Sequence, residues 1–176
     1  MLVNIIIITS IIHMQTGIIF EFNKDCDISS WLIVNDVVMG GKSSSDFSLG
    51  QEGYGEFTGK VSLANNGGFS SLRYRMEGMD IGSYSSFVIR LKGDGKNYQF
   101  RAKTSARDYY SYITYINTTG EWQTVEIPFD LLYPNYRGRK LNMDNFPGSY
   151  LEEIGFLIGN KKAEEFTLLI KSISLK

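Results

Sequence analysis

Residues that ordinarily build catalytic and metal sites are scarce in this sequence. The one cysteine, Cys26, excludes an intramolecular disulfide and a zinc site made of several cysteines. The one histidine, His13, lies in an unusual N-terminal segment, so a Ser-His-Asp or Cys-His apparatus would require that segment to fold back. Neighbouring glutamates such as Glu152 and Glu153 do not suit a glycosidase, which places two carboxylates across a cleft. We therefore expect a protein that is not an enzyme and that uses no metal or cofactor.

Charge of one sign and long hydrophobic runs are also lacking. The formal net charge is −1, which provides no overall field to attract nucleic acid or an anionic membrane. The apolar run at residues 5–12 is too short to span a bilayer. We therefore expect neither a nucleic-acid partner nor a membrane span.

Residues 1–17 form the unusual N-terminal segment. Its apolar run resembles the h-region of a signal peptide, but no Lys or Arg precedes the run and no small-x-small cleavage site follows it. Alternatively, Met14 is the true start and the residues before it are misassigned. A cytoplasmic product is slightly favoured over an exported one, and we place a single domain at residues 18–176.

Aromatic residues, at 14%, and glycine, at 18 residues, are abundant, and this composition is typical of β structure. Hydrophobic and polar side chains alternate with a period of two in residues 55–63, 71–76, 86–91, 98–103 and 122–129. Turn signals separate these segments, and none of them sustains a helical period. The pattern predicts an all-β protein with about ten short strands in an antiparallel sandwich or barrel.

Three local features refine this prediction. Asp94 and Gly95 predict a hairpin turn between two consecutive strands. Residues 130–145 are the longest irregular region, with one helical turn at residues 131–133. The last strand changes its inward face near Lys171, which predicts a β-bulge.

Two glycine-rich stretches stand out from the strands. WLIVNDVVMGGKSSS, at residues 31–45, and NNGGFSS, at residues 65–71, each contain a glycine pair between Asn or Asp and Ser. Paired glycines permit a positive φ or a close approach of the backbone, and the serines hydrogen-bond to local backbone. The spacing alone slightly favours two ordinary hairpin or corner turns, and the alternative is two loops that meet in the fold.

Asp36 is the charged residue of the first loop. Its carboxylate can accept hydrogen bonds from the Gly40 and Gly41 amides, or pair with Arg90 or Arg101. In this interpretation Asp36 fixes the loop. Contact with a ligand or with calcium is the alternative.

Arginines and aromatic residues within the strands are further candidates. Arg90, Arg101 and Arg137 interrupt apolar or aromatic surroundings, and an arginine fork there points to solvent, pairs with a buried acid or binds a carboxylate ligand. Trp122 is expected in the core, with stacking on a sugar ring as the alternative. Residues 109–116 are aromatic on both faces, which suits a central strand or one that lines a groove.

Six sequence blocks occur in an order that carries a family resemblance. They are VNDVVMGGKSSS, GEFTGKVSLANNGGFSSLRYR, IRLKGDGKNYQFRAKT, GEWQTVEIPF, YRGRKL and IGFLIGN, followed by a closing FTLLIKSI. Together they make residues 20–176 resemble the complex I intermediate-associated protein 30 family. The motif residues that match by position are Asp36, Met39, Gly40, Gly41, Ser43, Ser44, Asn66, Gly67, Gly68, Phe69, Ser70, Arg90, Gly93, Asp94, Gly95, Tyr98, Trp122, Arg137 and Gly138. We add Arg101 to these as a candidate binding residue.

The resemblance implies a galactose-binding-domain-like jelly-roll β-sandwich. It also implies a non-enzymatic module that engages a protein partner during assembly or folding, such as a respiratory-complex subunit. The chain contains no strand-GxGxxG-helix unit, so no dinucleotide site is carried over from relatives fused to such a domain. A carbohydrate-binding module of an exported protein, with a small polar or sugar ligand, remains the alternative.

Overall fold

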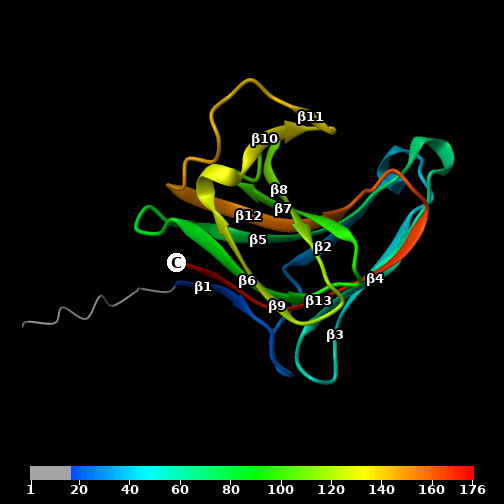
Figure 1. The fold of residues 1–176 in the computed structure, drawn as a ribbon, viewed down its shortest axis with the longest axis horizontal. Helices are drawn as coiled ribbons and strands as arrows, with labels where there is room; N and C mark the ends of the chain where they lie inside the picture. The colour runs from blue at the N-terminus through cyan, green and yellow to red at the C-terminus, as the bar shows by residue number, and fades with distance from the viewer. Residues whose placement is uncertain (1–16) are drawn as a thin grey trace, which may run out of the picture.

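The computed structural model describes residues 17–176 and shows two antiparallel β-sheets packed face to face (Figure 1). The six-stranded sheet contains β1 (Gly17–Glu21), β3 (Ser44–Leu49), β4 (Gly55–Val61), β6 (Ser86–Lys92), β9 (Gln123–Pro128) and β13 (Glu164–Leu175). Its order is β3-β4-β13-β6-β9, and β1 pairs with β13. The predicted jelly-roll sandwich is therefore confirmed.

The seven-stranded sheet has the order β11-β10-β8-β7-β12-β5-β2. Its strands are β2 (Trp31–Asn35), β5 (Ser70–Asp80), β7 (Asn97–Lys103), β8 (Ser111–Asn117), β10 (Tyr133–Tyr136), β11 (Arg139–Lys140) and β12 (Tyr150–Ile158). Three short 3-10 helices lie in the connections: η1 (Asp36–Met39), η2 (Ala64–Asn66) and η3 (Phe129–Leu131). Gly17, which we placed in the N-terminal segment, opens β1. The other predictions for that segment fall on residues 1–16, outside the described part of the chain.

The alternating pattern predicted the core correctly. Phe87, Ile89 and Leu91 of β6 are fully buried, and so are Tyr98 and Phe100 of β7 in the opposite sheet. The rings of Phe87 and Phe100 meet across the sandwich with their centroids 5.0 Å apart. Each such burial contributes roughly 1.5–3 kcal/mol, so the two inner faces hold the sheets together.

The link at Asp94 and Gly95 is not the predicted hairpin. Gly95 has φ +80, as a tight turn requires, but β6 and β7 belong to different sheets and do not pair. The turn instead carries the chain from one layer to the other. Crossing between the layers lets the inward side chains of both strands pack against each other across the core.

The region that we predicted to be irregular contains two short strands, β10 and β11. The helical turn lies at Phe129–Leu131, before the predicted position. Strand β3 was also not predicted, because its serine-rich sequence alternates only weakly. Both β3 and β11 are edge strands, where a partner on one side tolerates polar side chains.

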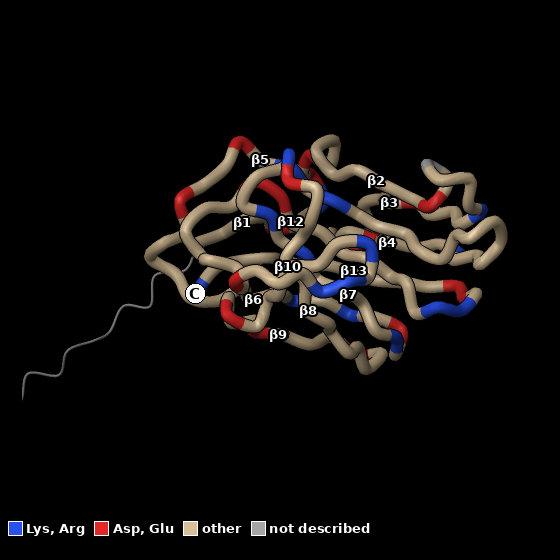
Figure 2. Tube along the Cα trace, turned by 90° about the horizontal axis from the view of Figure 1, so that it is seen from above, with Lys and Arg blue, Asp and Glu red and all other residues tan. Residues whose placement is uncertain are grey.

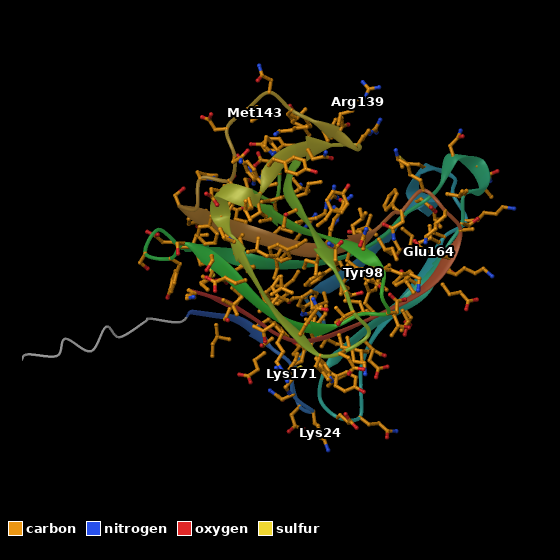
Figure 3. The ribbon with its side chains drawn as sticks, viewed as in Figure 1. Lys24, Tyr98, Arg139, Met143, Glu164 and Lys171 are labelled. Atoms are coloured by element: carbon orange, nitrogen blue, oxygen red, sulfur yellow. The ribbon has the colours of Figure 1, made fainter. Side chains whose placement is uncertain are left out.

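The predicted β-bulge in β13 is confirmed. Its pairing register shifts between Ile170 and Ser172, and Lys171 at the shift donates from Nζ to the carbonyl oxygens of Phe22 (2.7 Å) and Gly53 (2.9 Å). Figure 3 labels Lys171 on this sheet and Tyr98 between the layers. The bulge thus directs an ammonium group to two carbonyls that strand pairing leaves free.

Charged residues are interspersed along the trace in both layers (Figure 2). Among residues 17–176, none of the helices is long and apolar enough to cross a membrane. Because the charges are interspersed, any surface of one charge sign is formed by a few local side chains.

Candidate binding groove

The two glycine-rich loops meet at the carboxylate of Asp36, which is fully buried at the start of η1. Its Oδ1 accepts a hydrogen bond from the Ser43 amide (2.9 Å). Its Oδ2 accepts from the Ser43 hydroxyl (2.5 Å) and from the amides of Gly68 (2.6 Å) and Phe69 (3.2 Å). One carboxylate therefore joins residues 36–43 to residues 68–69.

The donors to Asp36 differ from the predicted ones. The amides of Gly40 and Gly41 donate to backbone carbonyls of their own turn, and neither Arg90 nor Arg101 contacts the carboxylate. Burial raises the pKa of Asp36, but the hydrogen bonds outweigh this effect and hold the pKa below its ordinary value. The group is therefore ionised at neutral pH without a cationic partner.

Gly41 and Gly67 are needed because the backbone comes so close to this carboxylate. A Cβ atom at Gly67 would lie 2.6 Å from Asp36 Oδ2, and one at Gly41 would collide with the same carboxylate. At both positions a side chain would displace the acceptor that holds the loops together. The glycine pairs thus serve close approach here, as well as a positive φ at Gly68 (+136).

A groove of about 620 Å³ lies on the outer face of the seven-stranded sheet, next to this junction. Its lining comes partly from the β10–β11 hairpin, at the top of Figure 1, and from the glycine-rich loops, at the upper right. Met39, Gly68 and Phe69 contribute from the loops, and Arg137 and Gly138 from the hairpin. We call this feature the groove.

The floor of the groove is basic. Arg73 of β5 and Arg101 and Lys103 of β7 point outward, because their neighbours Leu72, Phe100 and Ala102 point into the core and side chains alternate along a strand. Burial, and then the charge of Arg73, lower the pKa of Arg101 to about 10, while Glu153 opposes the shift. Arg101 therefore remains a cation at neutral pH, but nearby acidic groups only partly compensate its charge.

Two other parts of the lining are apolar and aromatic. Val34, Met39, Phe69 and Leu157 lie at the loop end. Tyr109, 66% exposed, and Tyr136 lie at the hairpin end, with ring centroids 5.1 Å apart and planes at 84°. The Arg137 guanidinium covers the Tyr136 ring at 5.3 Å. These tyrosines therefore form an edge-to-face pair rather than one flat platform.

The structure brings only part of the predicted site together. The groove contains the candidates Met39, Gly68, Phe69, Arg101, Arg137 and Gly138. Gly40 and Asn66 occupy exposed turns, whereas Ser43 and Ser70 are buried beneath the loops. Sequence reasoning missed Arg73, Lys103 and Tyr136, although Arg73 and Lys103 stand at the polar positions of alternating strands.

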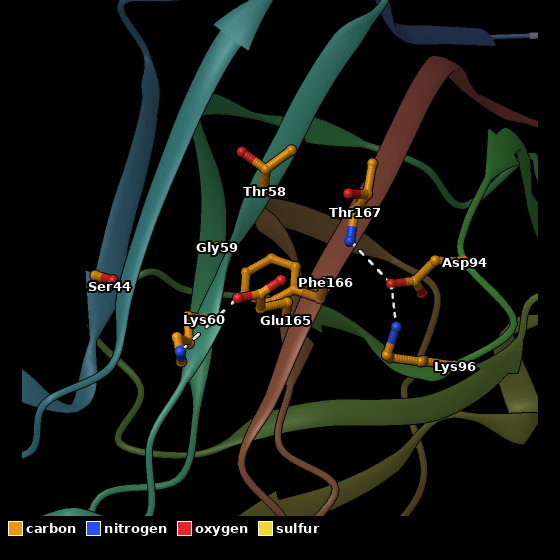
Figure 4. Close-up of a pocket in the computed structure, with 9 residues that line it drawn as sticks. All are labelled: Ser44, Thr58, Gly59, Lys60, Asp94, Lys96, Glu165, Phe166 and Thr167. Atoms are coloured by element: carbon orange, nitrogen blue, oxygen red, sulfur yellow. Dashed lines mark hydrogen bonds and ion pairs between the residues drawn. The ribbon is translucent and has the colours of Figure 1, made fainter.

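Asp94 lies elsewhere, in a shallow hollow on the six-stranded sheet that Ser44 also lines (Figure 4). Its carboxylate accepts hydrogen bonds from Lys96 (2.5 Å), the Thr167 amide (3.0 Å) and the Tyr98 hydroxyl (2.9 Å). These bonds tie the turn between the sheets to β13. Asp94 and the buried Tyr98 therefore hold this turn in place, outside the groove.

Trp122 is not in the core, contrary to our prediction. It is half-buried just before β9, where Arg90 lies over its ring at 5.8 Å and Tyr54 meets it edge to face at 5.6 Å. Counted back from the inward Val125 and Ile127, the alternation of β9 gives residue 122 the outward parity, and the strand itself begins only at Gln123. This pair belongs to the six-stranded sheet and does not reach the groove.

No cluster of three or more His, Cys, Asp or Glu side chains within residues 17–176 is placed to hold a metal ion. The polar groups that line the groove are those of arginine, lysine, tyrosine, serine and amide side chains, with Asp108 as the acidic residue. Such a lining can bind anionic and hydrogen-bonding ligands.

Solved structures with a similar fold include carbohydrate-binding modules and an agarase. A family 11 carbohydrate-binding module from Clostridium thermocellum, solved with a β-1,3-1,4-mixed-linked tetrasaccharide, has a TM-score of 0.65 at 18% identity, covering 91% of this chain and 94% of that one. The agarase AgWH50C has a TM-score of 0.62 at 14% identity, covering 92% of this chain and 24% of that one. At these identities the likeness concerns the fold, which is a galactose-binding-like jelly roll.

The relatives identified by sequence have a different name from the solved structures described above. The mitochondrial complex I intermediate-associated protein 30 of Drosophila melanogaster is 25% identical over 187 residues, which cover 92% of this chain and 63% of that protein. The protein of the same name from Mus musculus is 20% identical over 188 residues, covering 94% and 57%. This chain thus spans about three fifths of the length of these relatives. The sequence profile of complex I intermediate-associated protein 30 matches residues 20–170, and the chain belongs to that family.

Proposed function

We propose that this chain is a non-enzymatic binding module that engages a protein partner during the assembly or folding of a respiratory complex. Family membership supports the class of function, since the relatives are named for association with complex I intermediates. The observation that carries the proposal is the groove, where a basic floor adjoins an apolar end.

The composition of the groove suits a protein segment. Protein interfaces combine buried apolar contacts with arginine and tyrosine, which are enriched among residues that dominate binding energy. Met39, 55% exposed, and Tyr109, 66% exposed, offer such side chains at opposite ends. The Asp36 junction holds the loop end in place, which reduces the entropy lost on binding.

Site-specific crosslinking tests this proposal. A photo-crosslinking amino acid replaces Tyr109 in the groove, and a control protein carries it at Glu165, whose side chain is 81% exposed on the six-stranded sheet. Irradiation in native cells, followed by mass spectrometry, should identify the same protein repeatedly from position 109 and not from position 165. That protein should be a subunit or assembly partner of a respiratory complex. Equal capture at both positions, or capture of glycans alone, would count against the proposal.

A second candidate is a carbohydrate-binding module, favoured by exposed tyrosines in the groove and by the solved structures of this fold. Tyr109 and Tyr136 line the groove and are 66% and 37% exposed. Calorimetry with a mixed-linkage β-glucan tetrasaccharide tests it directly. Saturable binding that Tyr109→Ala abolishes would favour this candidate over the first, and the absence of heat would remove its support.

A further inference from the structure

The strand register places two arginines on either side of a glycine on the floor of the groove. Gly155 of β12 pairs with Arg73 of β5 on one side and with Arg101 of β7 on the other. Directly paired residues of antiparallel strands project from the same face, so the three positions form one row. The outer strands of three neighbours are about 10 Å apart, and Gly155 has no side chain to fill the space between the arginines.

Within the described residues 17–176, neither arginine of this row forms an ion pair with a carboxylate. Glu153, two residues from Gly155 on β12, is already bound to Arg75 at 2.8 Å. The acidic residue of the lining, Asp108, accepts from the Thr104 hydroxyl at 3.2 Å. The two cations thus share a floor without counter-charges of their own.

Two buried polar atoms in the same place also have no hydrogen-bond partner among the described residues. They are Nε of Arg101, a donor, and Oε1 of Gln99, an acceptor, two residues apart on β7. Buried polar groups are nearly always satisfied in folded proteins. A ligand that both accepts and donates hydrogen bonds would satisfy this pair when the two side chains turn toward the groove.

We propose that Arg73 and Arg101 bind a side-chain carboxylate of an acidic, extended segment of the protein partner above Gly155. This inference rests on the proposed function and specifies the chemistry of the partner. A carboxylate accepts paired hydrogen bonds from a guanidinium fork, and the backbone amide of the same segment can donate to Gln99 Oε1.

The electrostatics agree with an anionic ligand. Burial and the like charge of Arg73 both disfavour the charged form of Arg101 and lower its pKa to about 10. A carboxylate between the two guanidinium groups would offset this repulsion with two attractions. Binding should therefore weaken as salt concentration rises.

The rest of the lining favours a peptide over a sugar acid. Leu157, only 8% exposed, and Phe69 provide apolar contacts beside the arginine row, which suit alternate side chains of an extended segment. Of the two tyrosines that line the groove, Tyr136 is covered by Arg137 and set edge to face against Tyr109, so they do not form the flat aromatic platform on which a sugar ring would stack. The groove is thus complementary to a segment that carries both acidic and hydrophobic side chains.

Fluorescence anisotropy with defined peptides tests this inference. The probe is a labelled peptide of about six residues alternating Glu and Val, which spans about 20 Å when extended. Its control replaces each Glu by Gln. Wild-type protein should bind the Glu peptide at least about tenfold more tightly, since a hydrogen bond to a charged group is worth one or two orders of magnitude in affinity.

Matched variants locate the effect. R73Q and R101Q should each weaken binding of the Glu peptide about tenfold, while R101K should retain only part of the affinity because it keeps the charge but lacks the fork. R90Q removes the same charge from the other sheet and should bind like wild type. Circular dichroism checks folding. If R101Q does not fold, the partly exposed Arg73 provides the decisive variant.

Several outcomes would overturn the inference: equal binding of the Glu and Gln peptides, no binding of the Glu peptide, or R90Q losing as much affinity as R73Q. Tighter binding of tetragalacturonate than of the Glu peptide would also refute it, since the carboxylate would then come from a sugar. Crosslinking at Tyr109 separates this inference from the proposed function. A protein captured there together with equal peptide affinities would refute the carboxylate site and leave the binding module standing.

Discussion

Replacing Asp36 by asparagine tests whether one carboxylate holds the two glycine-rich loops together. The side chain is fully buried and accepts four hydrogen bonds, three of them at Oδ2. Asparagine has nearly the same shape, so the substitution leaves no cavity. It replaces one acceptor oxygen by an NH₂ group that cannot accept.

The magnitude follows from the least damaging orientation of the amide. Its oxygen would take the Oδ2 position and keep the bonds to the Ser43 hydroxyl and to the Gly68 and Phe69 amides. The NH₂ group would then face the Ser43 amide, which donates at 2.9 Å in the wild type. One lost bond to a charged acceptor costs about 1.5–3 kcal/mol, and three weakened bonds add to it, so we expect a loss of about 2–4 kcal/mol.

Urea denaturation at several pH values measures this loss. Because the folded-state pKa of Asp36 is depressed, its contribution is fully present above the unfolded-state value, about 4, and disappears as the pH falls through the folded-state value. The stability gap between wild type and D36N should therefore be constant above about pH 5 and narrow as the pH falls below the unfolded-state value of about 4. D25N, at an exposed position, should differ from wild type by less than about 0.5 kcal/mol. A D36N protein as stable as wild type, or a gap independent of pH, would refute this reasoning.

Three further substitutions test other parts of the fold by thermal and urea unfolding. Gly68→Val forces a β-branched residue to φ +136, with its Cβ 3.3 Å from Leu63 Cδ2, and should destabilise by about 1–3 kcal/mol; an unchanged melting temperature would contradict this. Lys171→Met leaves two carbonyl oxygens without their donor and should destabilise the protein by about 2–4 kcal/mol. A Lys171→Met protein as stable as wild type would contradict this. Tyr98→Phe removes the hydroxyl bond to Asp94 and should cost only about 1–2 kcal/mol, because two other donors remain; a loss above about 4 kcal/mol would show that the Asp94 turn depends on it.

The sequence was informative wherever a local pattern decides the structure. Alternation identified the buried face of β6, since Phe87, Ile89 and Leu91 can be inside only together. The change of face near Lys171 likewise located the bulge. Strand partners were harder to predict from the sequence. Asp94 and Gly95 signal a turn, but distant contacts decide whether the next strand pairs with the previous one or crosses to the other sheet.

The groove was only partly predictable for the same reason. Arg101 was a candidate because it interrupts an apolar segment. Arg73 lies near it only because both β5 and β7 pair with β12, a strand that follows both of them in the chain. The donors to Asp36 were predicted from its own loop. Two of them come instead from Gly68 and Phe69, because tertiary packing brings the second loop to the carboxylate.

Hydrogen–deuterium exchange on the complex with the captured partner tests the central claim most directly. If the groove is the binding surface, bound partner should slow amide exchange in β5, β7, β8 and the β10–β11 hairpin, and in the loop at Gly68. Exchange in β4, β9 and β13 of the six-stranded sheet should remain unchanged. Protection confined to the six-stranded sheet, with the groove strands unaffected, would contradict the account.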